Sequence, residues 1–435
     1  MYGHSSSCAR PSRHTPAAPN EQVMLSIARR LYNNNAGGSR ISQSAVRIAT
    51  AGVAIGVLVM VMSLSIALGF QNEVRRKVAD MAGYIEVVNA KSMYQSTSMP
   101  IQVTDSLVRE LRAIPGVERV QRYAVQTGMF KTADAFRGTV VRGIGSEYDL
   151  TFIRSCMADG HIPQFGAGDS PSDSIIISGR TANALKLKTG DRVYAYFFTS
   201  QLRARRYIVA GIFNTYLSDF DDNLVFADVR NVQGIAHWDR DIYSGAEVIL
   251  PGFRDLNETA MKVGRVVLNL TDSNGQYYAN PTVREIYPQI FSWLTLLDTN
   301  VIAILILMIC VACVTMVSGL LIIILERTQF IGIMKAMGAT DPQLRHLFLY
   351  LSAMIVVRGM VIGNAIAFAL LYLQKYTGVA KLDPANYYLN TVPVSFPWTQ
   401  IAIVNISTLV ICVMVLVIPS YLISRIHPAK SIRFE

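Results

Sequence analysis

The chain has 435 residues and a formal net charge of +10, with 51% hydrophobic and only 16% charged residues. This composition places the chain in a membrane, because four of its runs reach the roughly 20 apolar residues needed to cross a bilayer core. No folded cytoplasmic region is large enough to bind nucleic acid. The positive charge is therefore interpreted as a signal of membrane topology and of contact with anionic lipid.

The chain begins with a polar extension, residues 1–23, which we expect to be disordered because it is rich in Ser, Pro and His. It has no apolar core and is therefore not a cleavable signal peptide. Met24 begins the first patterned segment and is a candidate translation start. Residues 24–45 are expected to form a cytoplasmic elbow helix that lies on the membrane surface, with Arg29 and Arg30 on its polar side.

The predicted fold is a membrane α-helical protein with one span, a large α+β extracytoplasmic domain, and then three spans. The expected transmembrane helices are residues 46–70, 298–325, 347–373 and 398–424. The segments between and after them are the stalk and external domain at 71–297, a connection at 326–346, a loop at 374–397 and a tail at 425–435. Basic residues gather at both termini and in the connection. The positive-inside rule therefore makes these three segments cytoplasmic and places the domain and loop outside.

Two of the spans contain glycine pairs at a spacing that lets membrane helices approach closely. The pairs are Gly52 with Gly56 and Gly359 with Gly363. Arg358 is costly in the middle of the third span, so we expect it to face a cavity or a polar partner such as Asn364 or Asn405. The alternative is that Arg358 lies near the membrane interface and the span has different bounds.

Apolar stripes at helical spacing continue beyond the first span and precede the second. The stripes are Phe70, Val74, Val78 and Met81, and Val283, Ile286, Ile290 and Leu294. We expect Pro288 to kink the second of these helices. Two spans that extend outward would pack as a stalk and link the membrane to the external domain. Alternatively, the stripes dock on the core of that domain, which would still couple them mechanically.

Strand patterns and helix patterns alternate through the external region, which indicates an α+β domain. We expect two subdomains, one formed by Tyr84–Gly143 with Ala246–Thr271 and the other by the inserted Ser146–Trp238. Cys156 is the only cysteine of this region, so no disulfide can form within it.

The cytoplasmic connection contains an amphipathic helix. Its apolar face is formed by Phe330, Ile333, Met334 and Met337. Lys335 lies opposite this face, and Gly338 suits a left-handed helix cap. Asp341 and Pro342 are expected to be the N-cap and the first residue of the next helix. A short helix of this kind suits docking into a partner's groove, although it could also lie on lipid headgroups.

No catalytic set is recognisable in the sequence. The phosphate-binding pattern G-x-x-x-x-G-K-[ST] is absent, so the chain itself should not hydrolyse ATP. Cys310-x-x-Cys313 has a metal or redox spacing but lies inside the second span, where apolar packing is the better interpretation. We expect a non-catalytic protein that binds no metal or cofactor directly.

Taken together, these features resemble the FtsX/MacB-type permease family of ABC transporters, and within it the LolC/LolE lipoprotein-releasing permeases. The resemblance covers nearly the whole chain from Met24 and rests on four stretches. They are SLSIALGFQNEVRRKV, IIISGRTANALKLKTGDRV, ERTQFIGIMKAMGAT and the ending HPAKSIRFE.

The resemblance implies that Glu326–Gly338 is a coupling helix that docks into a cytoplasmic ABC ATPase dimer, which binds the ATP and Mg. The docking residues would be Phe330, Ile333, Met334 and Met337, with Glu326, Arg327 and Lys335 setting their orientation. It also implies a bacterial inner-membrane location, a second permease subunit, identical or not, a lipoprotein substrate and a periplasmic carrier. Carrier-recruiting members have a protruding hairpin, whereas Thr199–Arg206 is short, so that role stays open.

The predicted function is therefore that of a permease subunit that transmits ATPase motion through its stalk to extract lipoproteins toward a carrier. One alternative is a MacB-like efflux permease for another substrate. The other is an FtsX-like scaffold that controls cell-wall hydrolases and transports nothing. A membrane enzyme is a distant fourth, since no catalytic set supports it.

Overall fold

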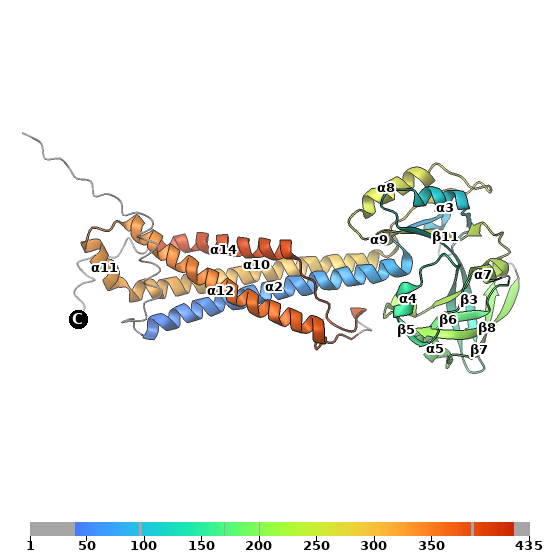
Figure 1. The fold of residues 1–435 in the computed structure, drawn as a ribbon, viewed down its shortest axis with the longest axis horizontal. Coiled ribbons are helices and arrows are strands. Elements are labelled where there is room, and N and C mark those ends of the chain that lie inside the picture. The colour runs from blue at the N-terminus through green and yellow to red at the C-terminus, as the bar shows by residue number, and fades with distance from the viewer. Residues whose placement is uncertain (1–39, 95–97, 169, 200, 384–386, 422–435) are drawn as a thin grey trace, which may run out of the picture. The chain divides into compact units, whose positions relative to one another are not determined.

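The computed structural model describes residues 40–421 except 95–97, 169, 200 and 384–386 (Figure 1). The predicted polar extension, most of the predicted elbow segment and the predicted tail lie outside these residues. The chain divides into two compact units. The helical unit comprises residues 1–65, 299–373 and 395–435, and the sheet unit comprises residues 66–298 and 374–394.

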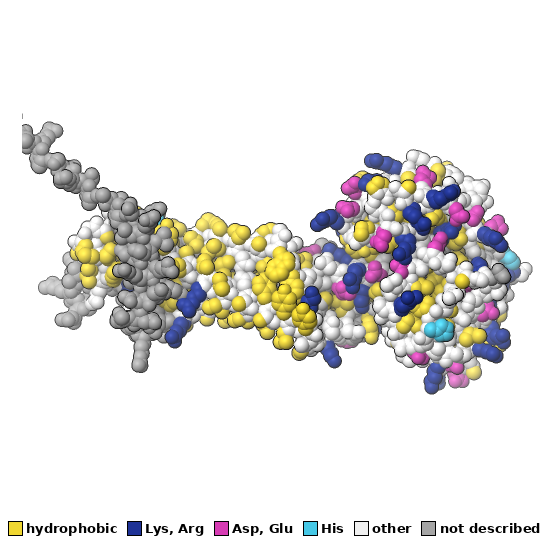
Figure 2. Space-filling model, in the orientation of Figure 1, with side chains coloured by type: hydrophobic (Ala, Val, Ile, Leu, Met, Phe, Trp, Pro, Cys, Tyr) yellow, Lys and Arg dark blue, Asp and Glu magenta, His cyan; other side chains and the backbone are white. Residues whose placement is uncertain are grey.

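Within the described residues, four helices are long and apolar enough to cross a membrane. They are α2 (Arg40–Ala82), α10 (Pro288–Glu326), α12 (Asp341–Thr377) and α14 (Trp398–Ser420). Helices satisfy every backbone hydrogen bond within one segment, which is what an apolar chain in lipid requires. Figure 2 shows hydrophobic side chains over the visible surface of these helices. Among the four, α2 is the most deeply buried within the protein.

The sheet unit is built on one mixed ten-stranded sheet. Its strands are β1 (Ile85–Asn89), β3 (Arg119–Lys131), β4 (Phe136–Ile144), β5 (Met157–Gly160), β6 (Ser174–Ser178), β7 (Arg192–Phe198), β8 (Leu202–Phe213), β9 (Leu224–Asp228), β11 (Gly245–Ile249) and β12 (Tyr278–Ala279). The strand order is β12-β1-β11-β3-β4-β9-β6-β8-β5, and β7 pairs with both β3 and β8. A separate pair is formed by β2 (Ile101–Gln102) and β10 (Ile242–Tyr243).

Short helices cover this sheet. They are α3 (Asp105–Arg112), α4 (Thr151–Ser155), α5 (Gly179–Leu185), α6 (Ser218–Asp221), α7 (Val229–Ala236), α8 (Leu256–Val267) and α9 (Val283–Ile286), with a 3-10 turn η1 at Ala90–Met93. In Figure 1, α3 and α8 lie side by side, and α7 packs on β3 and β4. Thr104 and Ser178 accept backbone N–H bonds as the N-caps of α3 and α5, which is why these helices begin where they do.

The two predicted subdomains do not correspond to two separate sheets. Strand β4 belongs to the predicted subdomain formed by Tyr84–Gly143 and Ala246–Thr271. It pairs in parallel with β9, which belongs to the predicted insert Ser146–Trp238. One hydrophobic cluster contains Ile85 and Val248, from the segments that flank the insert in sequence, together with Ile176 and Phe213 from the insert. Alternating patterns locate strands, but they do not determine which strands pair across long sequence separations.

The sequence predicts a kink at Pro288 within one continuous helix, but the structure has two separate helices there. Helix α9 ends at Ile286, Tyr287 leaves the helical conformation with φ −116 and ψ 56, and α10 begins at Pro288. Proline suits the first position of a helix because its missing N–H is not needed there. The second apolar stripe is therefore divided between α9 and α10.

A buried carboxylate, Asp228, ties the start of α7 to a neighbouring loop. It accepts backbone N–H bonds from Gly166 at 3.1 Å and Ser172 at 3.2 Å, and it pairs with the Arg230 guanidinium at 2.8 Å. Burial opposes ionisation of Asp228, but the hydrogen bonds from Arg230, Ser172 and Gly166 outweigh it and lower the pKa of this carboxyl group.

We expect the Asp228→Asn variant to be less stable at neutral pH by about 2 kcal/mol, because a neutral amide cannot replace these charged hydrogen bonds. The folded pKa lies below the unfolded one, so the carboxylate stabilises the protein fully above the unfolded value of about 3.9. This stabilisation is lost as the pH falls through the folded pKa. Melting temperatures of the detergent-solubilised protein should therefore converge for wild type and variant in acid.

The matched control is Asp173→Asn, which removes a carboxylate that is 58% exposed. This change should shift the melting temperature little at any pH. An equal shift for Asp173→Asn and Asp228→Asn would contradict the anchoring role of Asp228.

Candidate functional site

Between α10 and α12 the chain forms a nine-residue helix, α11 (Thr328–Ala336). Arg327 occupies its N-cap position, directly after Glu326, the last residue of α10. At the other end Gly338 has a φ of +96, a conformation that favours glycine. The N–H groups of Gly338 and Ala339 donate to the carbonyls of Lys335 and Met334 at 3.0 and 2.9 Å. This pair of bonds is a Schellman motif and ends the helix at the predicted glycine.

Helix α12 begins one residue earlier than the sequence predicts, so Asp341 is its first residue and Pro342 its second. Thr340 precedes the helix, and its N–H donates to the Gln343 side chain at 3.0 Å, which is half of a capping box. Asp341 instead binds the Lys335 ammonium at 2.8 Å, with the Lys335 side chain only 11% exposed. This ion pair fixes α11 against the start of α12.

Helix α11 exposes part of its predicted apolar face. Ile333 is 52% exposed and Met337 is 70% exposed, while Phe330 and Met334 are half-buried. On its other side, Ile331 is fully buried. Because Met337 follows Ile333 by four residues, the two side chains form one apolar ridge on the surface. We call Ile333 and Met337 the α11 ridge.

Three polar residues were predicted to orient this helix. Both carboxylate oxygens of Glu326 are buried, and neither has a hydrogen-bond partner among the described residues. Arg327 is half-buried. Lys335 is held by Asp341, as described above. The roles of Glu326, Arg327 and Lys335 in orienting the docking contacts stay predictions.

The predicted stalk stripes are buried in the hydrophobic core of the sheet unit. The members of that core are Phe70, Val74, Val78, Met81, Val283, Ile290 and Leu294, whereas Ile286 is half-buried. Phe70 of α2 and Trp293 of α10 also meet directly, with ring centroids 5.6 Å apart. The two helices therefore contact each other and also share the core of the sheet unit.

Sequence reasoning missed the polar contacts along these helices. Gln71 is 2% exposed, and its amide donates to Asp298 at 2.6 Å, which joins α2 to α10. The Lys77 ammonium donates to the carbonyls of Thr215 at 3.3 Å and Tyr388 at 3.1 Å, which joins α2 to two loops. A signal was available for Gln71, since it is a polar residue on an otherwise apolar helix face.

In the helical unit, the first predicted glycine pair faces α10. A Cβ atom on Gly52 would lie 2.4 Å from the Thr315 methyl group, so the two helices approach as closely as glycine allows. A Cβ atom on Gly56 would lie 3.6 Å from the Ala312 Cβ, an ordinary contact. Only the first glycine of this pair is required by the packing.

The second glycine pair lies where α12 meets α2. A Cβ atom on Gly359 would lie 2.9 Å from the carbonyl oxygen of Thr50, and one on Gly363 would lie 2.5 Å from that of Ala54. These neighbours are backbone atoms, which cannot move without moving the helix. Helix α2 is thus in close contact with both α10 and α12, as small residues at membrane helix interfaces allow.

Two of the polar residues in the predicted spans pair with each other. Asn364 donates to the Asn405 side-chain oxygen at 2.8 Å, and Asn405 donates back to Asn364 at 3.2 Å. This reciprocal amide pair joins α12 to α14. Arg358, for which both asparagines were predicted partners, lies on the exposed side of α12.

The cysteines of the Cys310-x-x-Cys313 spacing do not share surroundings. Cys310 is exposed, whereas Cys313 is buried with its Sγ 3.9 Å from that of Cys412. Within the described residues, no group of three or more His, Cys, Asp or Glu side chains is arranged to hold a metal ion.

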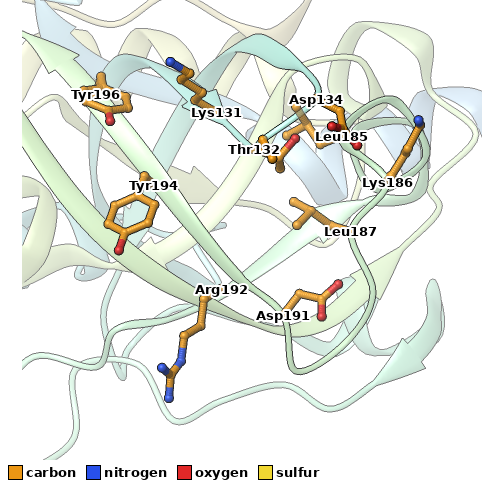
Figure 3. Close-up of a pocket in the computed structure, with 11 residues that line it drawn as sticks. Lys131, Thr132, Asp134, Leu185, Lys186, Leu187, Asp191, Arg192, Tyr194 and Tyr196 are labelled. Carbon is orange, nitrogen blue, oxygen red and sulfur yellow. The ribbon is translucent and has the colours of Figure 1, made fainter.

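The sheet unit carries an open hollow of about 470 Å³ that the sequence analysis did not predict. Figure 3 shows Lys131 from β3 and Tyr194 and Tyr196 from β7 at its border, with Leu187 and Asp191 from the turn before β7. Acidic and basic side chains both line it. This mixture selects no single class of ligand by charge.

Two family models match the chain. The model described as "FtsX-like permease C-terminal" matches residues 300–428. The model described as "MacB-like periplasmic core domain" matches residues 48–266, half of the chain. The FtsX-like model covers most of α10 and all of α12 and α14. The MacB-like model covers most of α2 and most of the sheet unit.

Curated relatives align with most of the chain. LolC of Xylella fastidiosa strain 9a5c is 20% identical over 401 residues, covering 88% of this chain and 92% of the relative. LolC of Neisseria meningitidis serogroup B is 21% identical over 412 residues, covering 89% and 94%. LolE of Haemophilus influenzae is 18% identical over 397 residues, covering 87% and 92%. Each is named a lipoprotein-releasing system transmembrane protein.

Solved structures of external domains are also similar. The extracellular domain of the noncanonic ABC-type transporter YknZ from Gram-positive bacteria is 20% identical with a TM-score of 0.32, covering 46% of this chain and 98% of that chain. The periplasmic region of MacB from Actinobacillus actinomycetemcomitans is 11% identical with a TM-score of 0.34, covering 48% and 92%.

The glycine contacts generate a matched pair of variants. Gly363→Ala should destabilise the protein by about 2 kcal/mol, because the added methyl group overpacks the contact between α12 and α2. Gly56→Ala should change stability by less than about 0.5 kcal/mol, since its Cβ has room. Thermal unfolding of the detergent-solubilised protein measures both. Similar melting temperatures for the two variants would contradict the close contact at Gly363.

Proposed function

Because this chain belongs to the ABC transporter permeases with a MacB-like periplasmic core domain and an FtsX-like C-terminal region, we propose that it is the permease subunit of an ATP-driven lipoprotein-releasing transporter. The substrate class rests on the names of the curated relatives, which align with most of the chain. In this proposal a separate ABC ATPase dimer binds ATP and Mg. A second permease subunit completes the membrane part, and a periplasmic carrier receives the lipoprotein.

The proposed topology has four helices crossing the bacterial inner membrane. The sheet unit faces the periplasm, and α11 and both termini face the cytoplasm. The basic residues of the α10–α12 connection, Arg327, Lys335 and Arg345, support this orientation through the positive-inside rule.

The α11 ridge is the observation that supports ATPase docking. It presents Ile333 and Met337 to solvent from a helix that is fixed at its C-terminal end by Gly338 and by the Lys335–Asp341 ion pair. Burying exposed apolar side chains against a partner is favourable, and an amphipathic helix in a groove is a common mode of recognition. We therefore assign the ridge to the ATPase cleft, with Phe330 and Met334 at the edges of the contact.

In the proposed mechanism, ATP-driven movement of the ATPase subunits displaces α11. Both α10 and α12 are joined to α11 and are in close contact with α2 at Gly52 and Gly363. Helix α2 then carries the displacement into the sheet unit, because its described residues form one helix from Arg40 to Ala82. The sheet unit moves and draws the lipoprotein out of the membrane toward the carrier.

The docking assignment is tested by Ile333→Asp. A carboxylate in an apolar cleft should weaken ATPase binding by about 2 kcal/mol, which is roughly thirtyfold in Kd. The measurement is the amount of ATPase that co-purifies with the permease. The control is His346→Asp, which adds the same charge at an exposed position of α12 and should leave co-purification unchanged. If as much ATPase co-purifies with the Ile333→Asp variant as with the wild type, the α11 ridge does not bind the ATPase cleft.

The substrate class is tested with the complex purified from native membranes. Addition of ATP should release a bound acylated protein. Export of a small molecule or peptide without such release would instead support the MacB-like efflux alternative. ATP-dependent activation of a cell-wall hydrolase, with no transported molecule, would support the FtsX-like scaffold.

A further inference from the structure

Helix α2 ends against the sheet at a buried guanidinium group. Arg142 of β4 is 6% exposed, and its Nη1 donates to the carbonyl oxygen of Met81 at 3.2 Å. This carbonyl belongs to the last turn of α2, where carbonyl groups lack partners within the helix. The other terminal nitrogen, Nη2, donates to the carboxylate of Glu247 on β11. One side chain therefore binds the end of the helix and the sheet at the same time.

Aromatic rings hold this guanidinium in place. The Arg142 Cζ lies 4.3 Å from the ring centroid of Tyr123 and 5.8 Å from that of Tyr148. A planar guanidinium that faces a ring gains cation–π attraction, which is stronger away from water. The position of Arg142 is thus set from several directions.

The acidic partner is equally constrained. Glu247 is fully buried and also accepts a hydrogen bond from the Gln121 amide at 2.7 Å. A second carboxyl group, the half-buried Glu86 of β1, accepts from the Tyr123 hydroxyl at 2.8 Å. Burial raises the pKa of Glu86, although Arg142 and the Tyr123 hydroxyl favour its ionised form. Side chains from β1, β3, β4 and β11, which are neighbours in the sheet, meet in this cluster.

The backbone at the end of α2 packs against the same acid. The chain leaves the helix through Gly83, which has a φ of +74. A Cβ atom on Gly83 would lie 2.9 Å from the Cβ of Glu247. Glycine is required here both by the left-handed conformation and by this contact. The helix end is therefore pressed onto the residue that binds Arg142.

We propose that Arg142 is the positioning residue that fixes the C-terminal end of α2 to the sheet, so that displacement of α2 moves the sheet with it. Apolar contacts alone are non-directional and permit sliding, whereas a buried charged hydrogen bond has one favourable geometry. A buried ion pair adds little net stability compared with apolar side chains of similar size, which leaves positioning as its main effect. The inference rests on the proposed function and assigns the point where motion enters the sheet.

The test uses the full-length protein with Arg142→Met and Glu247→Met combined. Removing both charges avoids leaving Glu247 unpaired, and Glu86 can take up a proton once Arg142 is gone, so the fold should persist. The Met81 carbonyl, however, loses its donor. Hydrogen exchange at the backbone amides of residues 79–84 should become about tenfold faster, the factor expected for one lost charged hydrogen bond. Amides in the central strands should keep their protection.

Arg119→Met is the matched control. It removes the ion pair between Arg119 of β3 and Asp149 of the loop after β4, at 2.8 Å, whose side chains are 39% and 40% exposed. Exchange at residues 79–84 should stay at the wild-type rate in this variant. Faster exchange in the control, or wild-type exchange in the double variant, would overturn the positioning role.

The second readout is ATP-driven release. The double variant should bind the ATPase and hydrolyse ATP as the control does, while most of the release of acylated protein is lost, because movement of α2 no longer reaches the sheet. Release at the control rate would also overturn the inference. If the wild-type complex releases no acylated protein, the proposed function fails, and the exchange comparison still decides the role of Arg142.

A conservative change covers the case in which the double variant does not fold. Arg142→Lys keeps a charge for Glu247 but lacks the planar fork that reaches the Met81 carbonyl at the same time. It should leave the sheet folded and accelerate exchange at residues 79–84. Wild-type exchange in this variant would contradict the two-sided contact of Arg142.

Discussion

Helix α2 is a single 43-residue helix whose apolar side chains are buried in both units of the protein. In the helical unit Val53 and Met60 are fully buried, and in the sheet unit Val74 and Val78 are fully buried. A helix of this length extends about 65 Å, roughly twice the thickness of a bilayer hydrocarbon core. The same chain segment therefore contributes to the membrane helices and to the core of the sheet unit. The proposed coupling of the two units depends on this continuity.

The two parts of α2 are held by different forces. In the helical unit, Gly52 of α2 lies against the Thr315 side chain of α10, and Gly363 of α12 lies against the backbone of α2 at Ala54, so the contacts are mainly van der Waals packing. At its C-terminal end, α2 meets a buried charged group, Arg142, which binds a main-chain carbonyl. In the proposed mechanism, the packing contacts transfer movement from α10 and α12 to α2, and the charged hydrogen bond transfers it from α2 to the sheet.

The features that could be predicted from sequence are those that a local period encodes. The apolar stripe at Phe70, Val74 and Val78 follows the helical repeat, and these side chains are buried. Gly338 could be placed at a helix end because a left-handed cap favours glycine. The predicted start of α12 is one residue too late, because both Thr340 and Asp341 are good N-cap residues and only the structure distinguishes them.

Features that depend on long-range pairing could not be predicted. Arg142 and Glu247 are 105 residues apart, and each lies in a strand where alternation suggests a solvent-facing charge. Only the pairing of β4 with β3 and of β3 with β11 brings them together. The parallel pairing of β4 with β9 likewise merges the predicted subdomains into one sheet. For Asn364 and Asn405 the sequence identified both residues as polar groups in predicted spans, but it did not predict that they bind each other.

The most direct test of the account is to interrupt α2 between its two parts and to measure ATP-driven release. Combining Ile66→Gly with Ala67→Pro introduces a flexible residue and a helix breaker where the helical unit ends and the sheet unit begins. We expect both units to stay folded, the ATPase to remain bound and active, and release of acylated protein to be lost. Release at the wild-type rate from a complex with this broken helix would contradict it.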